Sequence, residues 1–419
     1  MLQIDHIYEF FWQEIFNDFV NFQPTGGIVK LHPNINLDIN VACKDYFTSR
    51  FKIFFYDQEP FLPKFAVNYI KVFKFPSGYN LDELYQKKIK YDLDLPGDSG
   101  YIPDYETHLL NLANPSRMLK EADIFVTSEK SQEVNLYLQK YNMLGLYYFF
   151  HGFAAMDWYR GFHALNYNKQ IVKDYNYDFI AFNRIINNDR SYRIYFVSLL
   201  KEAGLLDKGL VSFGVADDLF DNWCDEVADP KSKLSERAKQ HIKQNLTGVS
   251  KLVIDHAELP GSASADIARG HDAFWNIVTE TVFYYDKLHL TEKIFKPIVS
   301  KQPFMLLAAP GNLEYLRSYG FKTFDGIIDE SYDNIQDDDA RIDAVVKQIK
   351  WYCNLSQEEK NRVIERLAPI VEYNFQHFYG KFKEIITDEL LDNTKTLFKE
   401  IDYDDSSVNY ATVRKLLTS

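Results

Sequence analysis

The chain has 419 residues, a formal charge of −13 and an aromatic fraction of 16%. This length exceeds what one core usually holds, so we expect two domains. The negative charge disfavours a general nucleic-acid binder or a partner at an anionic membrane surface, although a local basic cleft would escape this argument. Cys43, Cys224 and Cys353 are scattered and show no metal-ligand spacing. We interpret them as reduced, buried thiols in a cytosol-like compartment.

The N-terminal stretch MLQIDHIYEFF contains Asp5 and Glu9 and no basic segment. This composition argues against a signal peptide. No apolar run in the sequence reaches membrane-spanning length. We therefore expect a cytoplasmic protein without a membrane partner.

The first part of the chain alternates strand-like and helical segments. Apolar residues at helical spacing predict a helix over residues 5–20, and short apolar runs predict the strands that follow. The pattern strand, helix, strand is typical of a parallel sheet covered on both faces. The predicted strands are 51–56, 64–75, 123–129 and 144–150, and the predicted helix between the last two is 132–141.

The same alternation restarts after a junction near 160–176. It predicts strands at 177–182, 209–214, 251–256, 273–281 and 303–309, and helices at 188–204, about 232–245, 311–321, 340–353 and about 355–400. The predicted fold class is α/β, with two doubly wound, Rossmann-like domains facing a cleft and a helical C-terminal tail. Ligands in such sheets bind at the carboxyl ends of the strands. We expect the domains to span 1–165 and 166–375, with the tail at 376–419.

Two lysines lie where the backbone is already positive, in the segment HLTEKIFKP (289–297). Thr291 is a typical N-cap residue, and Lys293 and Lys296 follow in the first turns of the helix that it would begin. The dipole at a helix start favours acids rather than cations. Because Pro297 removes a helix hydrogen bond, the helix proper could instead begin at Pro297, with residues 291–293 in a loop.

The helix after the predicted strand 177–182 also begins with cations. Asn188 or Asp189 would cap it, and Arg190 and Arg193 lie three residues apart on one face. A bound diphosphate would resolve the conflict in both helices, because helix starts bind anions and Arg adds a bidentate fork. The simpler alternative is that the cations extend into solvent or pair with neighbouring acids.

Several segments resemble the α1,3-fucosyltransferase family. HLTEKIFKPIVSKQPFML (289–306) resembles its Thr-Glu-Lys donor-binding motif, and FWNIVTET (274–281) resembles the upstream segment that ends in a Glu. FNRIINNDRSYRIYFVSLL (182–200) resembles its Asn…Arg-x-x-Arg…Leu helix, and FFYDQEP (54–60) its Phe-Glu-Ser-Pro element. The chain also resembles glycosyltransferases encoded in bacteriophage genomes, which would place it in the host cytoplasm.

The resemblance implies a GT-B fold, with a nucleotide diphosphate sugar on the C-terminal domain and the acceptor mostly on the N-terminal domain. It implies inversion at the anomeric carbon with Glu59 as the base that deprotonates the acceptor hydroxyl. Glu292 would bind the ribose hydroxyls, and Lys293 with Arg190 or Arg193 would hold the diphosphate. The alternative for Glu59 is a strand-end acid paired with a lysine. The donor-binding residues implied are Arg190, Arg193, Glu280, Thr291, Glu292 and Lys293.

Three further residues are expected on the acceptor side. Asp57 lies beside Glu59 in the same segment, Asp157 could hydrogen-bond sugar hydroxyls, and Trp158 could stack on a sugar or base. The alternative for Trp158 is interdomain core. The family has Arg-Asn where this chain has Lys296-Pro297, so the resemblance leaves the sugar and the nucleotide base open.

These patterns predict an inverting glycosyltransferase that moves a sugar to a hydroxyl of a glycan or of a hydroxymethylated base in phage DNA. Six lysines between 64 and 90 would supply a basic stripe for DNA, or simply an exposed helix face. No metal-ligand spacing is visible, so the sequence requires no cofactor and leaves a divalent metal and the oligomeric state open. The competing hypothesis is a non-catalytic module that binds a nucleotide sugar or glycan.

Overall fold

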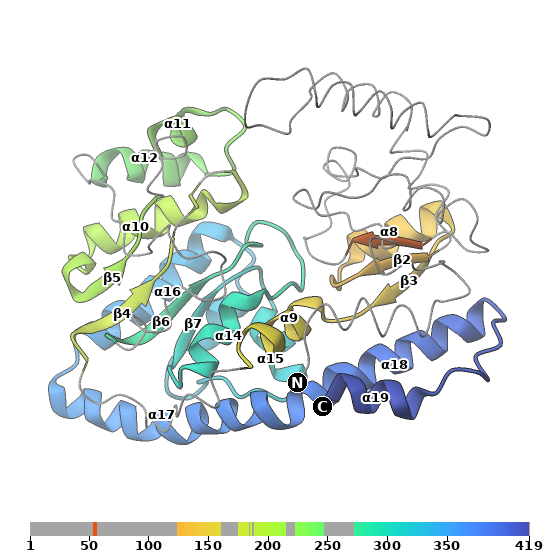
Figure 1. Ribbon diagram of the computed structural model, residues 1–419. Helices are drawn as coiled ribbons and strands as arrows, with labels where there is room; N and C mark the ends of the chain where they lie inside the picture. Colours follow the sequence, from red (N-terminus) through yellow and green to blue (C-terminus); the bar gives the residue numbers. More distant parts are fainter. Residues whose placement is uncertain are drawn as a thin grey trace, which may run out of the picture. The chain divides into compact units, whose positions relative to one another are not determined.

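The computed structural model describes residues 124–160, 175–183, 185–186, 188–214, 223–246 and 272–418, and the backbone of 53–56. Contacts divide the chain into two compact units (Figure 1). The first unit comprises residues 3–150 and 387–419, and the second unit comprises residues 151–386. The predicted domain boundary at 165 lies outside the described residues, and the predicted domain roles stay predictions.

The first unit contains a three-stranded parallel sheet in the order β1-β2-β3. Its helix α8 begins after Ser131, whose side chain accepts the N–H of Val134, and ends at Asn142 in the left-handed conformation. Such caps satisfy backbone groups that the helix itself leaves unpaired. The elements are β1 (Ile53–Tyr56), β2 (Ile124–Thr127), α8 (Gln132–Tyr141), β3 (Leu144–Tyr147), most of α18 (Lys383–Glu400) and α19 (Tyr410–Thr418).

The second unit is built on a four-stranded parallel sheet in the order β5-β4-β6-β7. The chain leaves β4 (Tyr177–Ala181) for β5 (Gly209–Val211) on one side, and later returns to β6 (Ala273–Thr279) on the other side. The last strand, β7 (Phe304–Leu307), pairs with β6. Strand order therefore reverses direction between β4 and β6, which is the topological switch point where ligands bind in open α/β sheets.

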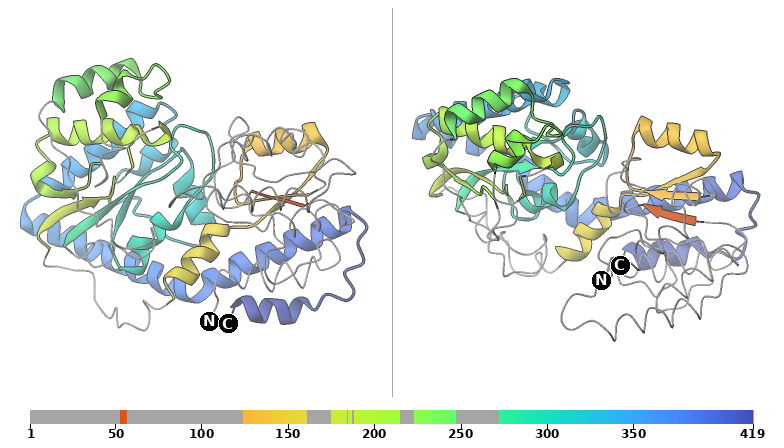
Figure 2. Two further views of the ribbon diagram at one scale, coloured as in Figure 1. Left: turned by 45° about the horizontal axis from the view of Figure 1, so that its top comes forward. Right: turned by 90° about the horizontal axis from the view of Figure 1, so that it is seen from above.

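Helices cover both faces of this sheet. Helix α14 lies against β6 and α17, whereas α16 lies against β4, β7 and α10, and Figure 1 shows α14 and α16 on opposite faces. Figure 2 shows the same layers from two further directions. The helices are α9 (Phe150–Trp158), η2 (Asn188–Arg190), α10 (Tyr192–Glu202), η3 (Leu206–Lys208), α11 (Trp223–Ala228), α12 (Glu236–Asn245), α14 (Glu292–Val299), α15 (Asn312–Ser318), η5 (Glu330–Asn334), α16 (Asp338–Cys353) and α17 (Gln357–His377).

A long helix occupies the C-terminal part of the chain. A capping box between Ser356 and Glu359 begins α17, and the π-helical segment η6 (Phe378–Phe382) connects it without a break to α18. The apolar face of η6 supplies Phe378 and Phe382, which contact the ring of Phe295 on α14. Aromatic packing of this kind anchors α14, the helix that the donor-binding motif predicts.

The α/β class and the C-terminal helix are confirmed, and most predicted elements of the described residues are present. The predicted helix 5–20 and the predicted strands 64–75 and 251–256 lie outside the described residues, as do the lysines between 64 and 90. Buried Cys353 fits the prediction, but the prediction for Cys224 was wrong, because Cys224 is exposed at the start of α11.

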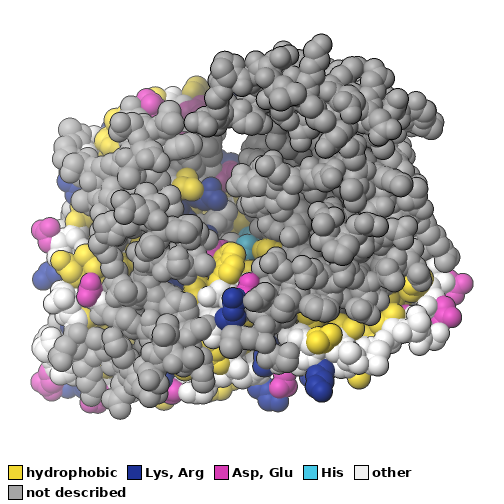
Figure 3. Space-filling model, viewed as in Figure 1, with side chains coloured by type: hydrophobic (Ala, Val, Ile, Leu, Met, Phe, Trp, Pro, Cys, Tyr) yellow, Lys and Arg dark blue, Asp and Glu magenta, His cyan; other side chains and the backbone are white. Residues whose placement is uncertain are grey.

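The described surface is mixed in charge, and the described helices are not of the membrane-spanning kind. The described part of the face in Figure 3 carries basic and acidic side chains together. Within the described ranges, no helix combines the length and the apolar composition that crossing a membrane requires.

We predict a large difference between two glycine substitutions. Gly320 and Gly326 both adopt positive φ, +87° and +76°, but a Cβ at Gly320 would lie 2.8 Å from the imidazole of His377, whereas a Cβ at Gly326 meets nothing within 4 Å. Gly326→Ala should cost about 1–2 kcal/mol of unfolding free energy from the backbone alone. Gly320→Ala should cost roughly 1–3 kcal/mol more, because His377 must move. Urea unfolding measures both, and equal losses would contradict the prediction.

Candidate functional site

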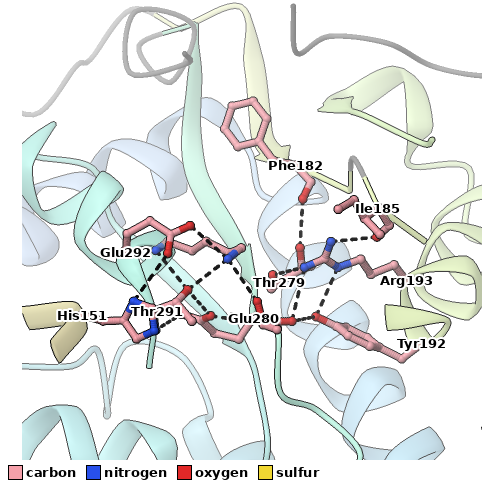
Figure 4. A network of polar contacts seen from close by, with 11 residues as sticks. His151, Phe182, Ile185, Tyr192, Arg193, Thr279, Glu280, Thr291 and Glu292 are labelled. Atoms are coloured by element: carbon pink, nitrogen blue, oxygen red, sulfur yellow. Dashed lines mark hydrogen bonds and ion pairs between the residues drawn. The ribbon is translucent and has the colours of Figure 1, made fainter. Parts of the chain in front are cut away.

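The candidate site lies at the carboxyl ends of β4 and β6. The hydroxyl of Thr279, the last residue of β6, donates to the carbonyl of Phe182, just beyond β4, at 3.0 Å. The site lies at the switch point, and Figure 4 shows how side chains from α9, α10, β6 and α14 converge there. The segments that the fucosyltransferase resemblance singled out in the second unit thus meet at one edge of one sheet.

Glu280 connects the end of β6 to the start of α14. It is fully buried, and its carboxylate accepts hydrogen bonds from the N–H of Thr291 at 3.1 Å, the Thr291 hydroxyl at 2.6 Å and the N–H of Thr281 at 3.2 Å. Burial raises the pKa of Glu280, while the Lys293 charge and the Thr291 hydrogen bond oppose that rise. All these partners are protein groups, so Glu280 has a structural task in positioning the motif.

Thr291 caps α14 as the sequence predicts. Its backbone is extended, and its hydroxyl oxygen accepts the N–H of Lys293 at 3.4 Å. The alternative start at Pro297 was wrong, because Pro297 is the sixth residue of the eight-residue helix. The hydrogen bonds from Thr291 to Glu280 hold the first turn in place, so the helix tolerates the missing N–H of Pro297 near its end.

The Lys293 ammonium lies within a ring of oxygen atoms. It donates to the hydroxyls of Thr281 at 3.2 Å and Thr291 at 3.1 Å, and to the Glu292 carboxylate at 3.1 Å. An ammonium group has three hydrogens, so these contacts use all of them. The Lys293 side chain remains 28% exposed. A ligand at this position would therefore meet a cation that is already oriented by the protein.

Glu292 is a buried carboxylate with cationic neighbours. One oxygen contacts the Lys293 ammonium, and the other lies 3.9 Å from Nδ1 of His151 on α9. Burial by itself would raise the pKa of Glu292, but the charges of Lys293 and His151 outweigh it and hold that pKa well below the usual range. Glu292 is thus an ionised hydrogen-bond acceptor at neutral pH.

His151 and His289 are site residues that the sequence patterns missed. Their rings pack edge to face with centroids 5.1 Å apart, and both are buried. Burial, followed by the charges of His151 and Lys293, lowers the pKa of His289 well below its ordinary value, so this imidazole is neutral. His289 lies inside the quoted motif and His151 in the segment between the predicted domains, but helical and strand periodicity carry no signal for their pairing.

Arg193 is buried and binds backbone rather than carboxylates. It donates to the carbonyls of Ile185 at 2.8 Å, Thr279 at 2.6 Å and Glu280 at 3.3 Å. The hydroxyl of Tyr192 donates to the same Glu280 carbonyl at 2.6 Å. Across the described ranges no acidic side chain forms an ion pair with Arg193. Its positive charge therefore remains uncompensated at the switch point, which favours an anion nearby.

The start of α10 differs from the prediction that Asn188 or Asp189 caps it. These two residues belong to the 3₁₀ turn η2, and the N-cap position of α10 is Ser191, whose hydroxyl bonds to Tyr284 at 2.9 Å instead of capping. Asp189 pairs with Lys233 at 3.0 Å. Arg190 ends η2 and is half-buried, so it reaches solvent where Arg193 does not.

The acceptor-side residues have a different outcome. Asp157 is buried near the end of α9 and pairs with Arg160. Trp158, the last residue of α9, is 37% exposed, and both its acceptor role and the alternative of interdomain core stay predictions. Asp57 and Glu59, the predicted base, lie outside the described residues. Their roles stay predictions.

The described residues show no metal site, and the comparisons with known proteins find no relative. In the described parts of the chain, no three His, Cys, Asp or Glu side chains gather in a way that could hold a metal ion. A scan against protein-family models finds no match for this chain, and searches of curated proteins and of solved structures find none either. The family resemblance therefore rests on the segments quoted above.

We predict that Glu280 makes the stability of the protein depend on pH. Because burial raises its folded-state pKa, the folded protein holds this proton more tightly than the unfolded chain does. Wild type should then lose stability relative to Glu280→Gln as pH rises above the ordinary Glu pKa of about 4.3. Urea midpoints of both proteins between pH 4 and pH 7 test the sign.

The exposed carboxylate of Glu365 supplies the control, because Glu365→Gln removes a charge at the surface alone. A difference between wild type and Glu280→Gln that grows in favour of wild type with rising pH would contradict the prediction.

Proposed function

We propose that this protein is an inverting glycosyltransferase of the GT-B type, with two doubly wound domains and the nucleotide-sugar donor bound by the second unit. The sugar passes to a hydroxyl acceptor, either on a glycan or on a hydroxymethylated base in phage DNA. The nucleotide diphosphate sugar is a substrate, and the sequence requires no cofactor and leaves a divalent metal open. The cytoplasm of the host is the expected location.

One observation carries the proposal. Glu280, Thr291, Glu292 and Lys293, together with Arg193 from a distant segment, gather at the carboxyl ends of β4 and β6. Residues 193 and 279 are 86 positions apart in the chain, so periodicity alone would not bring them together. A switch point with an oriented ammonium, an ionised carboxylate and an uncompensated guanidinium suits a nucleotide diphosphate.

The charge of each side chain determines which part of the nucleotide it would bind. The Lys293 ammonium would exchange one of its three present oxygen acceptors for the diphosphate and, with the half-exposed Arg190, stabilise the negative charge that develops as the nucleotide leaves. Glu292 would accept the ribose hydroxyls, because its low pKa keeps it ionised. Arg193 would act at short range through its charge while its donors hold the backbone of the site.

The catalytic base in this proposal is Glu59. It would take the proton from the acceptor hydroxyl as that oxygen attacks the anomeric carbon from the face opposite the leaving nucleotide. Asp57, Asp157 and Trp158 would contact the acceptor. A module that only binds the donor would keep the residues of the second unit and lack transfer, so product formation separates the two functions.

We predict that a nucleotide diphosphate sugar raises the melting temperature of the protein, because a ligand that binds the native state stabilises it. A panel of nucleotide sugars and free nucleotides should identify one that does so. Lys293→Ala should weaken that ligand roughly 10- to 100-fold, since a charged hydrogen bond contributes about 1.5–3 kcal/mol.

Each variant is compared with its own ligand-free protein, because Lys293→Ala also deprives the buried Glu292 of its cation. Lys350→Ala, an exposed lysine in α16, is the matched control and should bind like wild type. If no member of the panel stabilises wild type, the glycosyltransferase proposal fails.

We predict that a substitution at Arg190 mainly weakens ligand binding, whereas the same substitution at Arg193 mainly lowers the free energy of unfolding. Arg190→Gln should weaken the nucleotide sugar about tenfold with little loss of stability, because this side chain is half-buried at the end of η2. Arg193→Gln should lower the free energy of unfolding by roughly 2–4 kcal/mol, because the carbonyls of Ile185, Thr279 and Glu280 each lose a charged donor. Denaturation without ligand and binding titrations test this pair, and an unstable Arg190 variant with a stable Arg193 variant would reverse the assignment.

A further inference from the structure

Asn183 is a buried amide without a partner. It lies two residues beyond β4, its exposed fraction is 0%, and within the described part of the chain neither its side-chain oxygen nor its side-chain nitrogen has a hydrogen-bond partner. An amide offers one acceptor and two donors, so leaving all of them unpaired in the interior is costly. Buried polar groups of this kind are rare in native proteins and call for an explanation.

The backbone of Asn183 is held firmly. Its N–H donates to the hydroxyl of Ser212 at 2.6 Å, and its carbonyl accepts the N–H of Gly214 at 3.2 Å. Both partners lie just beyond β5, so the backbone of Asn183 is fixed against the segment that follows β5. The unpaired amide therefore belongs to a well-positioned residue, and only its side chain lacks partners.

Other buried asparagines of the second unit show the contrast. The amide of Asn374 in α17 bonds both the N–H and the carbonyl of Lys322 at 2.8 Å. The amide of Asn312 in α15 bonds the carbonyls of Lys287 and Ala309 and the N–H of His289. Asn183 is equally buried but lies just beyond the carboxyl end of β4, at the edge of the sheet where ligands bind in such folds and would supply what the protein does not.

We propose that the side-chain amide of Asn183 hydrogen-bonds an uncharged part of the donor substrate. That part presents a hydrogen-bond donor beside an acceptor. This inference rests on the proposed function, because it takes the ligand to be a nucleotide diphosphate sugar. A nucleobase edge and a pair of adjacent sugar hydroxyls both offer a donor next to an acceptor. Either group can therefore form two hydrogen bonds with the amide.

The hydrogen-bonding capacity of the amide argues against a phosphate as the group that Asn183 binds. A phosphate carries only acceptors, so it would repel the amide oxygen and leave that atom unpaired. In the proposed function Lys293 and Arg190 contact the diphosphate, whereas Asn183 has the two-sided hydrogen bonding that neutral groups need. Ile185, two residues further on, is 38% exposed, so the surface lies close to the buried Asn183 along the chain.

The first test measures the protein without ligand. Asn183→Leu replaces the unpaired amide by an apolar group of similar size, so its melting temperature should equal or exceed that of wild type. Asn374→Leu is the matched control, and it should melt roughly 4–10 °C lower because it leaves two backbone groups of Lys322 unpaired. Asn183→Ala serves as a second variant if the branched side chain does not fit. A loss at Asn183 as large as that at Asn374 would overturn the inference, because it would mean that the amide is satisfied within the protein.

The second test uses the nucleotide sugar that stabilises wild type, together with the corresponding free nucleoside diphosphate. Asn183→Leu should bind the nucleotide sugar at least roughly tenfold more weakly than wild type. Equal weakening of the free nucleotide assigns Asn183 to the nucleobase, and weakening of the nucleotide sugar alone assigns it to the sugar hydroxyls. Unchanged binding of both ligands would overturn the inference and leave the proposed function intact. If no nucleotide sugar stabilises wild type, both the proposed function and this inference fall.

Discussion

The hydrogen bonds between the Glu280 carboxylate and Thr291 are the constraint on which the site depends. They connect the end of β6 to the first turn of α14, so the position of the whole motif follows from one buried acid. The backbone carbonyl of the same residue accepts from Tyr192 and Arg193, which attaches α10 to the same point. A single residue thus joins two helices to the central strand of the sheet.

Four ionisable side chains lie close to this point, and only two of them form an ion pair with each other. Glu292 and Lys293 pair directly, so their charges largely cancel. Glu280 is more easily protonated than an ordinary glutamate, whereas Arg193 always carries its charge. The guanidinium of Arg193 and the unpaired amide of Asn183 lie beyond the carboxyl ends of neighbouring strands, and these are two kinds of group that a phosphorylated, hydroxyl-rich ligand uses. The neutral His289 packs edge to face on the ring of His151, whose Nδ1 lies 3.9 Å from the second oxygen of Glu292.

Sequence patterns succeeded where one segment decides its own structure. The apolar run of β6 and the N-cap chemistry of Thr291 both depend on neighbours within a few residues, and both predictions are confirmed. The cap at Asp189 failed because a competing contact, the ion pair with Lys233, lies outside the segment. The alternative start at Pro297 failed for the same reason, since Glu280 selects Thr291 from a distance.

The sequence by itself determined the α/β class, most of the described strands and helices, and which residue types are available for a phosphate site, because periodicity and caps are local properties. Only the tertiary structure decided the strand order β5-β4-β6-β7, and with it the meeting of Arg193 with Thr279 and Glu280. It also decided that Arg193 is bound by backbone carbonyls while Arg190 is half-buried. Hydrogen bonds between residues that are far apart in the chain depend on how strands are ordered in the sheet, and burial then sets the pKa of the groups enclosed.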